Sequence, residues 1–179
     1  EAFSVEYMAE RGLLWTGTAW NSFSVTFLVA VFSAPPTATI GILTAYLLTR
    51  HKFKGKNAFE FGTMLSFAIP GTIIGVSYVF AFNVPPIEMT STGLILVISF
   101  VFRNMPVGVR AGIAAMNQLD PHLDEASTTL NASSFQTFIN IILPLLKPAI
   151  VASLIFSFVR AMTAISAVIF LVSANYDLA

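Results

Sequence analysis

Four apolar stretches, each about as long as a membrane-spanning helix, limit what this chain can fold into. They cover residues 24–48, 58–82, 92–116 and 148–172. About 20 apolar residues are enough for a helix to cross a bilayer. Only 10% of the residues are charged and 56% are hydrophobic, whereas about a quarter of the residues in a soluble domain are charged. The sequence therefore predicts an all-α, polytopic transmembrane helical bundle, and it argues against a soluble enzyme or a disordered chain.

Local signals suggest how the first two stretches begin and bend. Asn21 and Ser22 precede the first stretch, and both residue types are suited to cap a helix. Pro35 and Pro36 lie near its middle, where we expect a kink because proline frees backbone groups that neighbouring helices must satisfy. Pro70 lies inside the second stretch, which we expect to cross as a single span.

The basic residues predict the orientation. Residues 50–56 hold four of the nine Lys and Arg residues, whereas residues 83–91 hold none and include Glu88. Because basic residues concentrate in cytoplasmic loops, residues 50–57 should be cytoplasmic and residues 83–91 outside. Two further crossings place residues 117–147 in the cytoplasm and both ends outside. The sequence begins with Glu1, not Met, so we expect it to be one transmembrane domain, residues 1–179, of a longer protein.

Several kinds of chemistry lack the residues they need. There is no cysteine, which excludes disulfides, thiolate catalysis and cysteine metal sites. Gly55-Lys56-Asn57 lacks the Ser or Thr and the upstream Gly of a phosphate-binding loop. The net charge is zero, so nothing favours nucleic acid as a partner. We expect no catalytic residue, no metal site and no cofactor in this chain.

The cytoplasmic segment 117–147 carries paired helix signals. Asp120 can cap a helix, and Asn131 can end it in a left-handed conformation. Ser133, with Gln136 three residues later, predicts a capping box at the start of a second helix, which we expect Pro144 to end. Two short helices joined by a sharp turn could dock into a groove of a partner, or they could pack only against their own bundle.

A motif in this segment resembles one in the permease subunits of binding-protein-dependent ABC importers. Those subunits carry Glu-Ala-Ala, three residues, Gly, nine residues and Ile-x-Leu-Pro. Here Ser127 replaces the second Ala and Asn131 replaces the Gly. The residues that the resemblance assigns to this ATPase-coupling loop are Asp124, Glu125, Ala126, Ser127, Asn131, Ile141, Leu143 and Pro144.

The resemblance implies a fold, partners and a mechanism. The fold would be the MetI-like permease domain, and the loop would sit in a cleft of a cytoplasmic ATPase dimer that binds ATP. The chain itself would be no enzyme and would move substrate by alternating access. Its other partners would be a periplasmic substrate-binding protein, membrane lipid and a second permease unit in the same or another chain. Its location would be the bacterial inner membrane, which it would cross several times.

Two further segments point to a substrate. Residues 103–110 and 165–173 resemble the ferric-iron importers, whose permeases often hold two such units in one chain, and this sequence looks like the second. Ferric iron is therefore the expected substrate, and phosphonate, thiamine, sulfate and polyamine are the alternatives. An integral-membrane enzyme or a transporter without an ATPase would need convergent polar groups or ion-coupling acids within the spans, which are not evident.

Arg160 is the one charged residue of the fourth stretch. It lies about 12 residues in, or roughly 18 Å, where a charge facing lipid costs at least about 2.5–3.5 kcal/mol. Ser157 and Ser153 share its helix face, so Arg160 should face the bundle interior. It either belongs to the translocation pathway with Ser157, or it binds carbonyl groups freed at Pro35 or Pro70.

Arg103 and Arg110 are seven residues apart and therefore share one helix face. Arg103 is a second candidate for the translocation pathway. The alternative is that both arginines form a pair at the cytoplasmic end that snorkels or contacts Glu60. Gly108 and Gly112 lie between them and are expected at a close helix contact.

Overall fold

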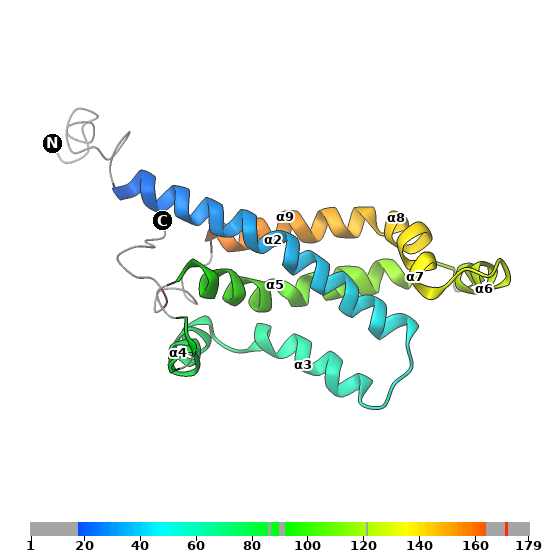
Figure 1. Cartoon of the computed structure of the whole chain (residues 1–179), viewed down its shortest axis with the longest axis horizontal. Helices are drawn as coiled ribbons and strands as arrows, with labels where there is room; N and C mark the ends of the chain where they lie inside the picture. Colours follow the sequence, from blue (N-terminus) through cyan, green and yellow to red (C-terminus); the bar gives the residue numbers. More distant parts are fainter. Residues whose placement is uncertain (1–17, 86, 90–91, 121, 164–170, 172–179) are drawn as a thin grey trace.

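Three helices form the centre of the bundle. The computed structural model describes residues 18–85, 87–89, 92–120, 122–163 and 171. Within this part, α2 (Thr18–Arg50) packs most extensively on α5 (Gly93–Met116), and both contact α9 (Lys147–Thr163). Figure 1 shows α2 and α5 running in one direction and α9 running in the opposite one. The fold is an all-α transmembrane bundle, as predicted.

The second apolar stretch is sharply bent, and the sequence did not predict this bend. It is divided into α3 (Lys56–Ala68) and α4 (Gly71–Phe82), whose axes differ by 105°. Pro70 has no N–H for a helical bond, and the residue before a proline is driven out of the helical region. Ile69 accordingly is extended, with φ −83° and ψ 132°. In Figure 1, α3 runs beside the bundle and α4 turns across its end.

A small hairpin follows α4. Strand β1 (Asn83–Val84) pairs antiparallel with β2 (Ile87–Glu88), and Asn83 lies opposite Glu88. The hairpin lies at the end of the bundle that the distribution of basic residues places outside.

The first helix is longer than expected. It includes Thr18, so Asn21 and Ser22 lie inside it and do not cap its start, contrary to the prediction. The Thr26 hydroxyl donates to the Ser22 carbonyl at 2.7 Å, an ordinary contact within a helix. The helix also continues without a break through Pro35 and Pro36.

The segment expected to be cytoplasmic folds into α6 (His122–Thr129), α7 (Ser134–Thr137), the π-helical turn η1 (Phe138–Ile142) and α8 (Leu143–Leu145). Pro144 does not end the second helix, which is a further correction. The π turn ends directly before α8, and Leu143 donates its N–H to the carbonyl of Phe138. This wider register lets the chain pass a proline that an α-helix would not accommodate. The axis then bends by 71° into α9.

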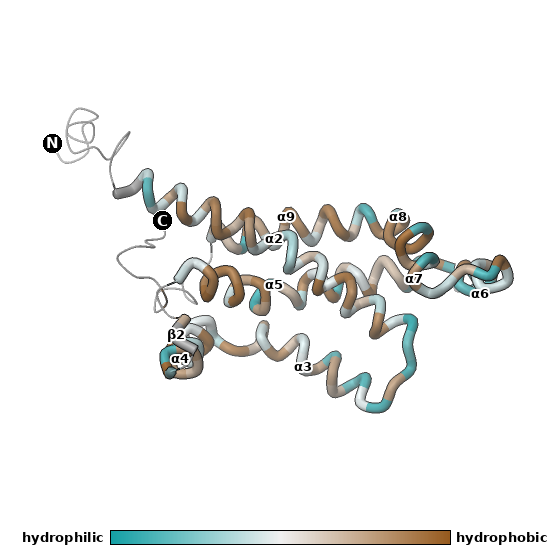
Figure 2. Tube along the Cα trace, in the orientation of Figure 1, coloured by the Kyte–Doolittle hydropathy of each residue, from teal (hydrophilic) through white to brown (hydrophobic). Residues whose placement is uncertain are grey.

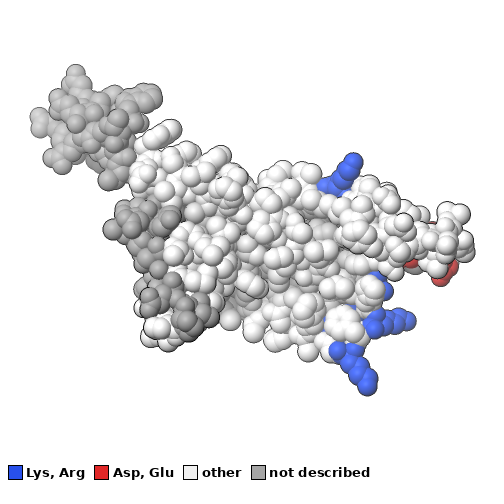
Figure 3. All heavy atoms as spheres, viewed as in Figure 1, with Lys and Arg blue, Asp and Glu red and all other residues white. Residues whose placement is uncertain are grey.

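Within the described residues, two helices, α2 and α5, are each long and apolar enough to cross a membrane. The two bent helix pairs raise this number to four if each pair serves as one span. The expected last stretch, 148–172, is described only to Thr163 and at residue 171, and its remainder lies outside the described residues. Figure 2 shows hydrophobic residues along the long helices and hydrophilic residues in the 50–56 segment and α6. On the face drawn in Figure 3, the charged side chains gather at that same end.

Glycines bring α2 and α5 together. A Cβ atom added to Gly41 would lie 3.0 Å from the backbone of Gly108, and one added to Gly112 would lie 2.5 Å from the Cβ of Ala45. Glycine therefore permits a closer helix approach than any side chain would. The expectation that Gly108 and Gly112 are close-packing positions is confirmed.

Candidate functional site

The turn between α6 and α7 has the local structure that the sequence predicts. The His122 N–H donates to Asp120 Oδ1 at 2.9 Å, so Asp120 caps α6. Asn131 has φ 61°, the left-handed conformation that asparagine tolerates. Ser133 and Gln136 exchange both bonds of a capping box. These three predictions are confirmed, and together they fix the direction in which α6 projects.

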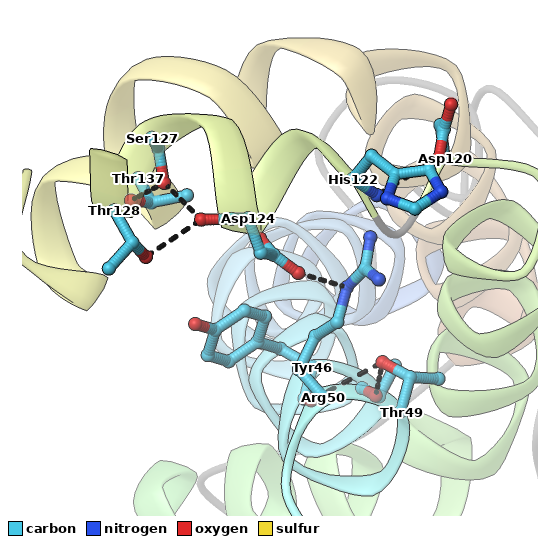
Figure 4. Close-up of polar contacts among 10 residues, drawn as sticks. Tyr46, Thr49, Arg50, Asp120, His122, Asp124, Ser127, Thr128 and Thr137 are labelled. Atoms are coloured by element: carbon cyan, nitrogen blue, oxygen red, sulfur yellow. Dashed lines mark hydrogen bonds and ion pairs between the residues drawn. The ribbon is translucent and has the colours of Figure 1, made fainter. Parts of the chain in front are cut away.

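An ion pair ties α6 to the end of α2. Arg50 Nε lies 3.1 Å from Asp124 Oδ2, a charge contact and not an aligned hydrogen bond. The Arg50 side chain is only 14% exposed, and its Nη2 is buried without a hydrogen bond. Figure 4 shows Asp124 reaching from α6 toward Arg50, beside Tyr46. Asp124 was expected in the loop, but its partner was not, because Arg50 is 74 positions away and gives no local signal.

A hydroxyl pair joins α6 to α7. Ser127 Oγ and Thr137 Oγ1 lie 2.8 Å apart, and both residues are buried. The Ser127 hydroxyl also lies within hydrogen-bond distance of the Asp124 carbonyl, at 2.8 Å. Figure 4 shows this pair next to the Asp124 contact. Ser127 therefore faces inward and holds the two short helices together.

The second half of the loop is anchored in the bundle. Phe138, Ile142 and Leu146 are buried in one cluster with Ile42 and Met116. The rings of Phe138 and Tyr46 are 4.6 Å apart. The motif residues beside this anchor are less buried, since Ile141 and Leu143 are partly buried and Pro144 is exposed. Phe138, Ile142 and Leu146 recur every four residues, a helical pattern that could have identified the buried face.

The outer face of α6 and its turn is exposed. Glu125 and Ala126 are both exposed, and so are the large apolar side chains of Leu130 (83%) and Phe135 (74%). His122 Nδ1 lies 3.1 Å from Glu125 Oε2. This hydrogen bond to Glu125, with the negative charges of Asp120 and Glu125, raises the pKa of His122 above its ordinary value.

Arg160 lies among aromatic rings. Its guanidinium carbon is 5.7 Å from the ring centre of Phe67 in α3 and 5.9 Å from that of Phe156. Arg160 Nε is buried without a hydrogen bond, and Ser157 and Ser153, which share its face, are each 1% exposed. Within the described residues no hydrogen bond joins Arg160 to the carbonyl of Pro35 or Pro70, which was the structural alternative.

Arg103 does not form the cytoplasmic pair considered above. It lies ten residues after the start of α5, roughly 15 Å along the helix. Its Nη1 is buried without a hydrogen bond, and Arg103 lines a cavity with residues of α3, the helix that also contacts Arg160. Arg110 instead donates its Nε–H to Met64 Sδ at 3.4 Å. Glu60 forms no ion pair with either arginine in the part of the chain that the structure describes.

The described residues contain no group of three or more His, Cys, Asp or Glu side chains placed to hold a metal ion. The structure thus brings the sequence-predicted residues together in two places. Asp124, Ser127 and the motif around them form the loop of α6 and α7, and Arg103 and Arg160 both lie beside α3.

Comparison with known proteins gives consistent matches. The family described as "Binding-protein-dependent transport system inner membrane component" matches residues 37–176. The putative ferric transport system permease protein FbpB 1 of Haemophilus influenzae is 54% identical over 157 residues, which is 88% of this chain and 25% of that protein. The ferric transport system permease protein FbpB of Actinobacillus pleuropneumoniae is 52% identical over 157 residues, 88% of this chain and 23% of that protein.

A more distant relative is the sulfate transport system permease protein CysT of Escherichia coli, 31% identical over 160 residues, 84% of this chain and 58% of that protein. The chain thus spans about a quarter of the length of the two ferric relatives. The family match covers most of the chain and agrees with the helical bundle and with the motif in the segment of α6 to α8. The chain therefore belongs to the inner membrane components of binding-protein-dependent transport systems, a family of permeases.

Proposed function

We propose that this chain is part of the permease of an ABC importer that carries ferric iron across the bacterial inner membrane. A cytoplasmic ATPase dimer would bind and hydrolyse ATP, and a periplasmic binding protein would deliver the substrate. A second permease unit, in the same or another chain, would complete the pathway. The observation that carries the transport function is the exposed, rigidly held tip formed by α6 and its turn.

The tip has the composition of a docking surface. Leu130 and Phe135 expose apolar side chains, and the Glu125 carboxylate in the same segment is also exposed. Exposed apolar groups with a polar rim are typical of protein interfaces. Because the 50–56 segment marks this end as cytoplasmic, a cytoplasmic protein would be the partner. The family motif favours the ATPase.

Two contacts would carry movement of the tip into the bundle. The Arg50–Asp124 ion pair connects α6 directly to α2. The Ser127–Thr137 pair connects α6 to α7, which continues through η1 and α8 to α9. When ATP closes the ATPase dimer, a displacement of α6 would therefore reach α2 and α9 together. To switch the permease, nucleotide needs to stabilise one of its two packings over the other by only a few kcal/mol. Roughly 1.4 kcal/mol changes the ratio of the two packings tenfold.

Glu125→Lys tests the coupling. The substitution lies outside the spans, so insertion and the amount of permease in the membrane should remain normal. Copurification of the ATPase and uptake of labelled substrate should both be lost. Lys54→Glu is the matched charge reversal at an exposed cytoplasmic position outside α6, and it should retain both. Normal uptake by the Glu125→Lys permease would contradict the coupling role.

The identity to ferric transport permeases, 52–54% against 31% for the sulfate permease, supports ferric iron as the substrate. The test is uptake in a strain that lacks the full-length permease and receives it back on a plasmid. Radiolabelled ferric iron should accumulate only in the complemented strain, and labelled sulfate should enter both strains equally. The reverse result would assign the chain to a sulfate-type importer.

The orientation can be tested separately because the chain has no cysteine. Single cysteines at positions 54, 88 and 131 can be treated with a thiol reagent that does not cross membranes. In intact spheroplasts only position 88 should react, and all three should react after lysis. Reaction of position 131 before lysis would place α6 on the wrong side for an ATPase.

Arg103, Arg160 and Ser157 would belong to the translocation pathway. Both arginines lie beside α3, and the Ser157 hydroxyl is buried without a hydrogen bond. Cations that face lipid at this depth would cost at least about 2.5–3.5 kcal/mol each. Arg160→Gln should therefore leave assembly and ATPase binding intact while uptake falls. Degradation of this variant would instead favour a structural role.

A further inference from the structure

Arg103 and Arg160 lie at a similar depth of the bundle. Arg160 lies thirteen residues after the start of α9, or roughly 20 Å, and Arg103 lies roughly 15 Å along α5, which runs in the opposite direction. Contacts with α3 place them at the same level. The Ser66 hydroxyl donates to the carbonyl of Phe102, the neighbour of Arg103, at 3.0 Å, and Arg160 lies over the ring of Phe67, the neighbour of Ser66.

No acidic side chain compensates these two charges within the described residues. In α2, α3, α4, α5 and α9 the one acidic residue is Glu60, seven positions before Phe67 and therefore about 10 Å away along α3. Two like charges in an apolar bundle repel each other, and water does not screen them there as it does in solution. Such a pair is stable when a negative charge lies between or beside the two cations.

The groups around the arginines include donors without acceptors. Arg103 Nη1 and Arg160 Nε are buried with no hydrogen bond, and the buried hydroxyls of Ser99 and Ser157 also have none. Ser99 and Arg103 line a cavity of about 350 Å³ between α3, α4 and α5. Further polar side chains of that cavity are Ser66, Ser77 and Tyr78. A ligand with several negatively charged oxygens would supply the missing acceptors, and guanidinium groups bind such ligands in a paired geometry.

We propose that Arg103 and Arg160 together bind a small oxyanion, of the phosphate or carboxylate class, near the middle of the membrane. This inference rests on the proposed function, because the anion would reach the site through the translocation pathway, as cargo or as the companion of a cationic cargo. A lipid phosphate offers the same chemistry, but lipid headgroups lie at the membrane surface, about 15 Å from the bilayer centre. A free oxyanion therefore fits the position of the site better.

Inorganic phosphate is the probe. The full-length permease, purified without the ATPase, is placed in nanodiscs of phosphatidylcholine, and its thermal unfolding is followed at constant ionic strength. Phosphate should raise the unfolding midpoint in a saturable manner, whereas chloride should not. Arg103→Gln and Arg160→Gln should each raise the half-saturating phosphate concentration at least about tenfold, because each removes charge-assisted hydrogen bonds. The control Arg110→Gln should respond like the wild type, since Arg110 is exposed.

Two results would overturn the proposal. One is a wild-type permease that phosphate stabilises no more than chloride does. The other is stabilisation that persists in the glutamine variants, or that appears only when phosphatidylglycerol is added, which would assign the arginines to lipid. If a glutamine variant fails to fold, Arg160→Lys and Arg103→Lys replace it, because lysine retains the charge but lacks the paired N–H donors of the guanidinium group. Each should weaken phosphate binding, and an unchanged response would also refute the site.

Iron uptake separates this inference from the proposed function. A wild-type permease that imports ferric iron but shows no response to phosphate would leave the proposed function intact and exclude the anion site. A permease that binds phosphate through both arginines but imports no iron would retain the site and lose the proposed substrate.

Discussion

Replacing Gly112 with alanine would place a methyl group inside the contact between α2 and α5. The new Cβ would lie 2.5 Å from the Ala45 Cβ and 3.2 Å from the Ile42 Cδ1. Carbon atoms in contact are normally about 3.5–4.0 Å apart. The two helices would therefore have to separate by roughly 1 Å at this point.

The expected loss follows from two opposing effects. Overpacking of this kind costs about 1–3 kcal/mol, whereas alanine is about 1 kcal/mol more favourable than glycine inside a helix. Gly62→Ala in α3 is the matched control, because its Cβ would meet no atom within 4 Å. That variant keeps only the gain in helix propensity. The free energy of unfolding of Gly112→Ala should thus lie about 1–3 kcal/mol below that of Gly62→Ala.

The assay is unfolding of the full-length permease by sodium dodecyl sulfate in mixed micelles, followed by circular dichroism. Ala45→Gly removes the methyl group that Gly112→Ala would contact, so the double variant should recover at least about 1 kcal/mol relative to the sum of the single variants. Equal stability of Gly112→Ala and Gly62→Ala, or strict additivity with Ala45→Gly, would refute the close contact between α2 and α5.

Three further predictions concern the cytoplasmic loop. Arg50→Asp and Asp124→Arg should each reduce substrate uptake per ATP hydrolysed at least about fivefold, because each leaves a charge unpaired. The double variant, which exchanges the two charges, should restore most of the uptake. If it does not, the ion pair between α2 and α6 does not carry the coupling. Asn131→Ala should lower the free energy of unfolding by about 1–2 kcal/mol, because φ at this position is 61°, a left-handed conformation that is unfavourable for alanine. Asn131→Gly should be neutral, and thermal unfolding of the two variants distinguishes them. The raised pKa of His122 means that its contribution to stability is fully present below the unfolded-state pKa of about 6.5 and is lost as the pH rises through the higher folded-state pKa. An NMR titration should show that raised pKa and its fall in Glu125→Gln.

The local structure of the loop could be predicted because each signal acts over a few residues. Asp120, Asn131 and Ser133 satisfy or direct backbone groups within three or four positions, so their residue types alone indicate the caps. The same holds for the apolar stretches, whose length is enough to predict membrane helices.

The features that the sequence analysis missed depend on tertiary context or on a choice between two outcomes. A proline inside an apolar stretch can kink a helix or break it, and here α2 continues through Pro35 while the chain breaks at Pro70. Neighbouring helices decide between these outcomes. The Arg50–Asp124 pair and the depth shared by Arg103 and Arg160 arise only after packing brings distant segments together.

The length of the segment that contains the π turn, Phe138–Ile142, fixes the orientation of α6. The π turn lies between Asn131 and Pro144, the last two fixed positions of the motif. The number of residues between them therefore sets the angle between the exposed face of α6 and the axis of α9. One residue more or less would rotate that face by about 100°. A change in the length of this segment would therefore turn the tip away from its partner, whereas substitution of exposed side chains outside the docking surface would leave the direction of the tip unchanged.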